Sequence, residues 1–207
     1  MDNSKKLKLE MALIDASRKG DLEVIKSLIK RGVSVETRDK KRNTPLIWAS
    51  HKGDLEIVKF LIEHGANIEA VNVLNTNSLM WATWSRHLGV VKFLIEQGAN
   101  IEAKDKKHNT PLIYAVLKEK NLEIIKFLIE QGANIEAKDG DHNTPLILAA
   151  YIGDIEVAKF LIGQGANVKA INKLGKHSLL SALIGSTDFA GKDHLEIIYF
   201  LNECGAE

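Results

Sequence analysis

The chain has 207 residues, of which 45% are hydrophobic and 27% charged, and its 28 basic and 27 acidic side chains leave a formal net charge of +1. This composition excludes an intrinsically disordered chain, and the near-zero charge excludes an overall field that would hold a polyanion or an anionic membrane. The single cysteine, Cys204, excludes both an intramolecular disulfide and a zinc site built from cysteines.

Targeting and membrane signals are missing from the sequence. No apolar run reaches the roughly 18 residues that a membrane span requires. The first ten residues are polar and rich in lysine, and the apolar stretch of a signal peptide does not follow them. We therefore expect a cytoplasmic protein, with the nucleus, or a host cell into which the protein is delivered, as alternatives.

The spacing of proline and glycine reveals an internal repeat. Pro45, Pro111 and Pro145 are all the prolines of the chain, and each is the middle residue of Thr-Pro-Leu. Residues 93–105 and 127–139 are identical, and one glycine recurs about every 33 residues, a period typical of repeat proteins. We predict a single domain, residues 1–207, of six repeats at about residues 8–38, 39–71, 72–104, 105–138, 139–171 and 172–207, with the first and last as caps.

Each repeat predicts, in chain order, a helix, a turn, a second helix and an extended finger. In the second repeat Thr44 caps a helix that has proline at its first position and ends near Gly53. Asp54 caps the second helix, residues 55–63. Residues 66–75 combine β-branched residues with turn formers in a stretch too short for a sheet, so they predict a finger.

The sixth repeat carries an insertion, residues 185–191, between its two helical stretches. An insertion in an inter-helix turn leaves the packing register intact, so we expect a surface loop there. A helix pair of this size cannot bury its own apolar face, and stability must therefore come from stacked neighbours.

The recurring segments Asn-Thr-Pro-Leu-Ile, Gly-Asp-Leu-Glu-Ile-Val-Lys and Gly-Ala-Asn-Ile-Glu-Ala-Lys-Asp resemble the ankyrin repeat over nearly the whole chain. The resemblance implies an all-α ankyrin-repeat solenoid of six helix-turn-helix-finger repeats with short β-hairpin-like fingers. It is silent on the partner, because ankyrin arrays resemble one another whatever they bind.

The chain departs from the family pattern at two recurring positions. The family usually has a histidine after Thr-Pro-Leu, whose ring hydrogen-bonds neighbouring repeats. Apolar residues, and hence apolar packing, replace it here: Ile47, Met80, Ile113, Ile147 and Leu180. The fingertip glycine of the family is replaced in four fingers by Arg42, Asn75, His108 and His142. Asparagine and histidine tolerate a positive φ better than most residues, so Arg42 is the least expected of the four.

No motif for catalysis or phosphate binding occurs. The chain lacks His-Glu-x-x-His, Gly-x-Ser-x-Gly, a phosphate-binding loop and Cys-x-x-Cys. His108 and His142 occupy equivalent fingertips, but only Asp141 could complete a metal site with them, so we interpret them as solvated turn residues. We therefore predict that the protein is not an enzyme and has no catalytic residue, no cofactor and no metal.

Positions that differ between similar repeats are candidates for function, because stacking constrains the positions that recur. Four residues after the helix cap the repeats have Trp48, Trp81, Tyr114, Leu148 and Ser181. Seven residues after the cap they have His51, Trp84, Leu117, Tyr151 and Ile184. These rows lie three residues apart on one helical face. By the resemblance, that face lies on the concave side overhung by the fingers. The first row is either core or exposed, and we expect the second row to be exposed.

The fingers add charge beside this face. Two fingers are basic, at residues 38–42 and 104–107, and the finger between them, residues 71–74, is apolar. A later finger is acidic and contains Asp139 and Asp141. The charges either keep the solenoid soluble or form a rim that suits an acidic partner segment. The predicted partner-binding residues are Trp48, His51, Trp81, Trp84, Tyr114, Leu117, Tyr151, Ile184, Lys40, Lys41, Arg42, Lys106, Lys107 and Asp141.

Three functional hypotheses follow from the sequence. The first is a monomeric, non-catalytic module that binds an unidentified protein on its concave aromatic and basic face, away from any membrane. The second is a groove of aromatic residues and lysines that holds a nucleotide or a short single-stranded nucleic acid. The third is a fragment or consensus-like array without a specific partner.

Overall fold

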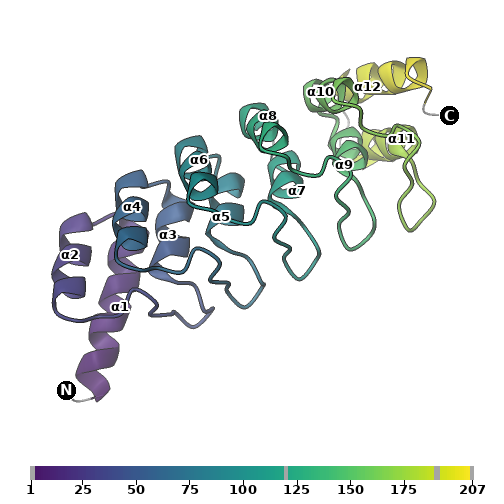
Figure 1. The fold of residues 1–207 in the computed structure, drawn as a ribbon. Helices are drawn as coiled ribbons and strands as arrows, with labels where there is room; N and C mark the ends of the chain where they lie inside the picture. The colour runs from purple at the N-terminus through teal and green to yellow at the C-terminus, as the bar shows by residue number, and fades with distance from the viewer. Residues whose placement is uncertain (1–2, 119–120, 189–191, 206–207) are drawn as a thin grey trace. The chain divides into compact units, whose positions relative to one another are not determined.

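The computed structural model describes residues 3–118, 121–188 and 192–205, and within these ranges the chain forms twelve helices and no strand. The helices are α1 (Asn3–Lys19), α2 (Leu22–Lys30), α3 (Pro45–Lys52), α4 (Leu55–Glu63), α5 (Ser78–Trp84), α6 (Leu88–Glu96), α7 (Pro111–Val116), α8 (Leu122–Glu130), α9 (Pro145–Ile152), α10 (Ile155–Gly163), α11 (Ser178–Asp188) and α12 (Lys192–Glu203) (Figure 1). The predicted all-α class is confirmed. No described helix is both long and apolar enough to cross a membrane.

The helices fall into two compact units, which we describe separately. Unit 1 is Met1–Asn100 and contains α1–α6, and unit 2 is Ile101–Glu207 and contains α7–α12. The first helices of successive repeats pack side by side, α1 on α3 on α5 in unit 1 and α7 on α9 on α11 in unit 2. The second helices form another layer, with α4 on α6 and, in unit 2, α8 on α10 on α12. One continuous array of six repeats stays a prediction.

Side-chain caps begin the helices where the sequence predicts them. Thr44 Oγ1 accepts a hydrogen bond from the Ile47 N–H at 3.3 Å at the start of α3. Asp54 Oδ1 accepts one from the Ile57 N–H at 3.2 Å at the start of α4, which ends at Glu63 as expected. These caps satisfy N–H groups that have no partner within the helix.

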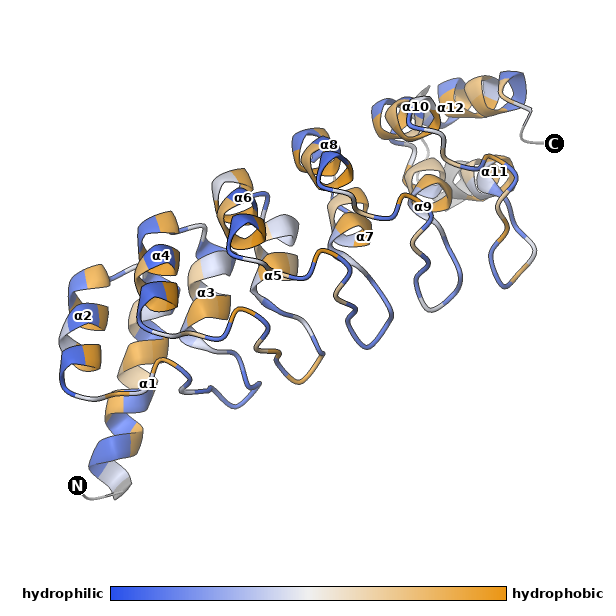
Figure 2. Ribbon diagram, viewed as in Figure 1, coloured by the Kyte–Doolittle hydropathy of each residue, from blue (hydrophilic) through white to orange (hydrophobic). Residues whose placement is uncertain are grey.

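Apolar packing at the position after Thr-Pro-Leu is confirmed for four repeats and wrong for the last. Ile47, Met80, Ile113 and Ile147 are at most 2% exposed. Leu180 of α11 is 37% exposed, so at this register the sixth repeat leaves its apolar side chain partly facing solvent. The helices thus carry the apolar residues, whereas the fingers are mostly hydrophilic (Figure 2).

Two helices are longer than the sequence predicts. Helix α1 begins at Asn3, ahead of the predicted start of the first repeat at about residue 8, in a lysine- and leucine-rich stretch of good helix formers. Helix α11 extends to Asp188, so residues 185–188 of the predicted loop insertion continue the helix. Residues 189–191 of that insertion lie outside the described part of the chain.

Four fingertip residues that stand where the family has glycine adopt a positive φ. The φ angles are 63° at Arg42, 62° at Asn75, 61° at His108 and 63° at His142. Arg42 tolerates this conformation because its N–H donates to the Asp39 carbonyl at 2.8 Å, which closes the turn. The left-handed residue is therefore part of a hydrogen-bonded turn even where its side chain is unfavourable.

Gly53, between α3 and α4, has φ +85°, and a Cβ placed there would meet the imidazole ring of His87. We predict that Gly53→Ala lowers the free energy of unfolding by about 1–2 kcal/mol from the backbone conformation alone, with the displaced ring adding to it. Gly89→Ala is the matched control, because Gly89 lies in α6 and its Cβ would meet only Leu55 at 3.9 Å. Urea denaturation should show the control unchanged or stabilised; equal losses would contradict the prediction.

Candidate partner-binding surface

A carboxylate organises the fingers. In the first finger Asp39 Oδ1 accepts hydrogen bonds from the N–H groups of Lys41 and Asn43, both at 2.8 Å. Asp39 Oδ2 accepts one from Asn43 Nδ2 at 2.9 Å and one from Trp48 Nε1 at 3.1 Å. Asp105 and Asp139 hold their own fingers in the same way. Asp139 therefore serves its own turn rather than an acidic rim.

The first row of aromatic residues ties helices to fingers. Trp48 reaches Asp39, Trp81 Nε1 donates to Thr76 Oγ1 at 3.0 Å, and the Tyr114 hydroxyl donates to Asp105 Oδ2 at 2.8 Å. All three side chains are half-buried, whereas Leu148 in the next repeat is only 8% exposed. The sequence left open whether these residues are core or exposed. The three aromatic side chains are in fact half-buried, and the ring nitrogen or hydroxyl of each is hydrogen-bonded within its own repeat.

These bonds shift the pKa values of the groups that make them. Burial alone would raise the pKa of the Asp39 carboxyl, but the hydrogen bonds from Asn43, Trp48 and Lys41 outweigh it and the pKa falls below the ordinary 3.8. Burial and the nearby Asp105 carboxylate raise the pKa of Tyr114 well above its ordinary value. At neutral pH the carboxylate of Asp39 is ionised and Tyr114 keeps the proton it donates.

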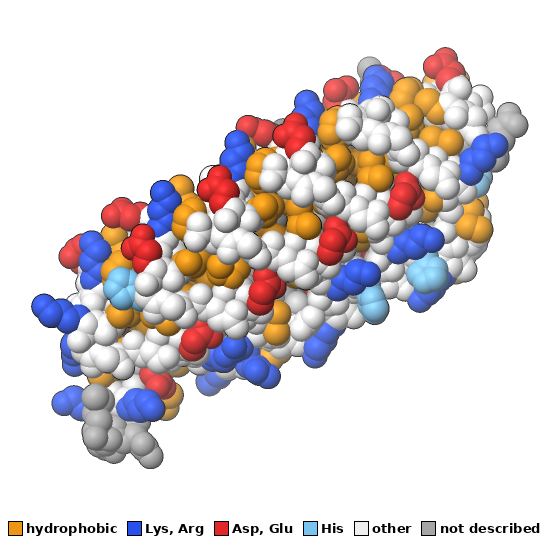
Figure 3. Space-filling model, viewed as in Figure 1, with side chains coloured by type: hydrophobic (Ala, Val, Ile, Leu, Met, Phe, Trp, Pro, Cys, Tyr) orange, Lys and Arg blue, Asp and Glu red, His pale blue; other side chains and the backbone are white. Residues whose placement is uncertain are grey.

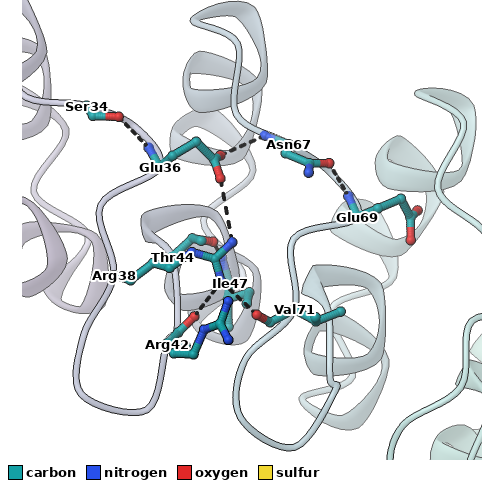
Figure 4. A network of polar contacts seen from close by, with 9 residues as sticks. All are labelled: Ser34, Glu36, Arg38, Arg42, Thr44, Ile47, Asn67, Glu69 and Val71. Atoms are coloured by element: carbon teal, nitrogen blue, oxygen red, sulfur yellow. Dashed lines mark hydrogen bonds and ion pairs between the residues drawn. The ribbon is translucent and has the colours of Figure 1, made fainter.

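A row of glutamates joins each finger to the next (Figure 4). Glu36 Oε1 accepts a hydrogen bond from the Asn67 N–H at 2.8 Å, and Glu69 Oε1 accepts the same bond from the Asn100 N–H. In unit 2 Glu102 accepts the same bond from the Asn134 N–H, and Glu136 accepts it from the Asn167 N–H. Backbone bonds add to these links, such as Val73 N–H to the Lys41 carbonyl at 2.9 Å. The glutamates are a connecting feature that the sequence analysis did not identify, although their recurrence at one register signalled it.

Unit 1 brings three of the predicted partner-binding residues together. The His51 ring lies 6.0 Å from that of Trp48 and 4.8 Å from that of Trp81, in an edge-on arrangement with Trp81. Arg18 lies over the Trp48 ring, 5.8 Å from its centroid. His51 Nδ1 is 2.7 Å from Ser85 Oγ. The aromatic rings therefore contact one another and a cation instead of standing free.

Unit 2 forms a hollow of about 380 Å³ between two fingers and two first helices. It contains three predicted residues: Tyr151 of α9 and Ile184 of α11, both half-buried, and the exposed Asp141. The other lining residues are Asn143, Ile147, Leu148, Asn172, Leu174, Lys176 and Ser181. Apolar side chains and polar finger groups thus line the same cavity.

The remaining predicted residues lie outside these two clusters. In the second row Leu117 is exposed, as predicted. The predicted exposure is wrong for the other four residues, which are half-buried: His51, Trp84, Tyr151 and Ile184. Lys40, Lys41 and Arg42 are exposed at the first fingertip, as are Lys106 and Lys107 at the third. Figure 3 shows such basic side chains along the finger edge. Arg38 is instead half-buried and donates to the Val71 carbonyl at 2.8 Å.

Sequence reasoning missed Ser181 and Lys176 as site residues. Both differ from the residues at the equivalent positions of the other repeats, so a comparison of equivalent positions could have identified them. In the described ranges no group of three or more histidine, cysteine, aspartate or glutamate residues is arranged to hold a metal ion. The arrangement provides apolar contact, charge and hydrogen bonding to a ligand.

Stacked helix pairs joined by fingers define a helical-repeat protein. Residues 13–105 and 102–172 match the family model of ankyrin repeats in three copies. These matches span more than half of the sequence, and the chain belongs to the ankyrin-repeat family. A search of the curated proteins finds no match. Ankyrin repeats are generally protein–protein interaction modules.

Glu69 tests the links between fingers. We predict that Glu69→Ala lowers the free energy of unfolding by about 1 kcal/mol, because the Asn100 N–H loses its acceptor Glu69 Oε1 and Asn77 Nδ2 loses its acceptor Glu69 Oε2. Glu69→Gln should cost less, since its amide oxygen still accepts. Glu63→Ala, at the exposed end of α4, is the control. Chemical denaturation checks the order, and a Glu63→Ala loss as large as that of Glu69→Ala would refute the role of the bond.

His51 tests the unit 1 cluster through pH. Burial first, and the nearby His87 second, lower the pKa of His51 below its ordinary 6.5. The unfolded chain therefore binds a proton at His51 more readily than the folded chain does. The free energy of unfolding keeps its full value above pH 6.5 and declines as the pH falls below 6.5. His51→Gln should flatten this dependence in urea denaturation series between pH 5 and 8. An unchanged slope in the variant would rule out His51 as its source.

Proposed function

We propose that this chain is a non-catalytic module that binds a protein partner on the side where the first helices meet the fingers. The observation that carries the proposal is the unit 2 hollow, in which Tyr151 and Ile184 lie beside polar groups of two fingers. Half-buried aromatic and aliphatic side chains gain stabilisation when a partner completes their burial. Unit 1 has its own candidate surface, in which the exposed basic fingertip, residues 40–42, supplies a polar rim.

A protein partner suits these surfaces better than a nucleotide or a single-stranded nucleic acid. Binding of bases requires open aromatic faces on which they stack. In unit 1 Arg18 lies over the Trp48 ring, and His51 contacts both Trp48 and Trp81. The ring nitrogens of the two tryptophans are hydrogen-bonded within their own repeats. We therefore propose contact through mixed apolar and charged side chains, as in protein interfaces.

Tyr151→Ala tests the proposed surface. We predict that the variant loses the proteins that the wild-type chain captures from its native source, because it removes the aromatic side chain from the hollow. Affinity capture followed by mass spectrometry measures the loss. Circular dichroism should show unchanged helix content.

Phe160→Ala is the matched control. Phe160 is an aromatic residue of the same repeat and the same half-buried class, but it lies on α10 with Lys126 over its ring at 5.7 Å. The control should capture the same proteins as the wild type. Equal capture by all three chains, or loss in both variants, would contradict the proposed surface.

A further inference from the structure

The last repeat departs from the others at a position that opens the unit 2 hollow. Ser181 stands four residues after the helix cap, where earlier repeats have Trp48, Trp81, Tyr114 and Leu148. Its backbone N–H donates to the His177 carbonyl at 3.0 Å, so the helix is regular at this point. Ser181 is only 4% exposed, so it lies at the base of the hollow that it lines, where its side chain occupies less volume than the larger residues at this register.

Lys176 is a second departure in the same hollow. In the preceding repeat the equivalent residue is Asn143, whose Nδ2 donates to the Asp139 carboxylate of its own finger at 2.9 Å. The sixth repeat has Asn172 in place of that aspartate, and Asn172 Nδ2 donates to Asn143 Oδ1 at 2.8 Å. Lys176 therefore has no acid in its own finger. Within the described part of the chain its ammonium group makes no hydrogen bond or ion pair, although the residue is half-buried.

Asp141 provides the opposite charge. At its register the other fingers have lysine or leucine, namely Lys41, Leu74, Lys107 and Leu174. Both backbone polar groups of Asp141 are hydrogen-bonded: its N–H donates to Asp139 Oδ1 at 2.8 Å, and its carbonyl accepts from the Lys173 N–H at 2.9 Å. Among the described residues no hydrogen bond or ion pair engages its carboxylate, and Asp141 is an exposed residue of the hollow's lining.

We propose that the unit 2 hollow receives one large apolar side chain of an extended protein segment, with an acidic residue of that segment against Lys176 and a basic residue against Asp141. This inference rests on the protein-binding function proposed above and specifies its partner. The apolar side chain contacts Tyr151 and Ile184 and covers Ser181, so the volume left by the serine is filled.

Charge and size both select this occupant. An unpaired ammonium and an unpaired carboxylate at the edge of one cavity complement a segment that carries both charges, and they disfavour a uniformly acidic or basic ligand. The cavity of about 380 Å³ lies near the lower end of the range of about 300–1,000 Å³ for ligand sites, which suits a single large side chain with its neighbours.

The test is a selection of random dodecapeptides displayed on phage against the full chain. We expect the enriched peptides to share a large apolar residue with an acidic and a basic residue close to it. Fluorescence anisotropy of one enriched peptide should show that Ser181→Leu weakens binding by about tenfold or more, because the new side chain fills the hollow. Leucine already stands at this register as Leu148, so the fold should tolerate it, as thermal unfolding would verify.

Two controls and a charge exchange sharpen the test. Ser181→Ala keeps the hollow and should bind as the wild type does. Lys138→Glu changes an exposed lysine beside the finger of Asp141 that does not line the hollow, and it should also leave binding unchanged. Lys176→Glu should weaken binding, and a peptide with lysine in place of its acidic residue should restore it.

The outcomes separate this inference from the proposed function. Peptides that tolerate Ser181→Leu and Lys176→Glu but are lost with Tyr151→Ala would overturn the assigned partner chemistry and leave the binding surface in place. Absence of enriched peptides, or enrichment without the two charges, would overturn the inference. Self-association that Ser181→Leu abolishes, measured by sedimentation, would assign the hollow to a second copy and would also overturn it.

Discussion

Every part of this structure depends on one constraint: a pair of short helices buries its apolar face only against the next pair. Helices such as α3 and α4, with eight and nine residues, are too short to be stable in isolation. The stacks of first helices bury Ile47 and Met80 in unit 1 and Ile113 and Ile147 in unit 2. The equivalent Leu180 of α11 is 37% exposed, so an apolar residue at this register is not buried by its residue type alone.

The fingers follow from the same constraint, because stacking places equivalent backbone groups of adjacent repeats close together. A glutamate at one register can then accept the N–H of the next finger, as Glu36 does from Asn67 and Glu102 does from Asn134. Each finger is also closed locally by an aspartate or asparagine at its base, Asp39 in the first. Polar bonding thus fixes the fingers at the edge of the helix layers, where their tips remain available to a partner.

The binding surface that we propose lies where a repeat departs from this shared scheme. Residues that complete the internal bonding, such as Tyr114 with Asp105, are constrained by the fold. The sixth repeat replaces the large side chain by Ser181 and the finger amide by Lys176, and both residues line the hollow. An open cavity and unpaired charges are features that a partner can satisfy, so the proposed binding chemistry concentrates in unit 2.

The sequence by itself determined the repeat and the helix starts at Thr44 and Asp54, because caps depend on residues only a few positions apart. The resemblance to the family implied the left-handed fingertips. The sequence identified Tyr151, Ile184 and Asp141 as candidates but not their common hollow. Only the tertiary structure decided that Trp48 is bonded to its own finger and that Ser181 and Lys176 line the cavity beside Tyr151. Exposure and side-chain pairing depend on what the adjacent repeat places opposite each residue, and that arrangement is absent from any single stretch of the chain.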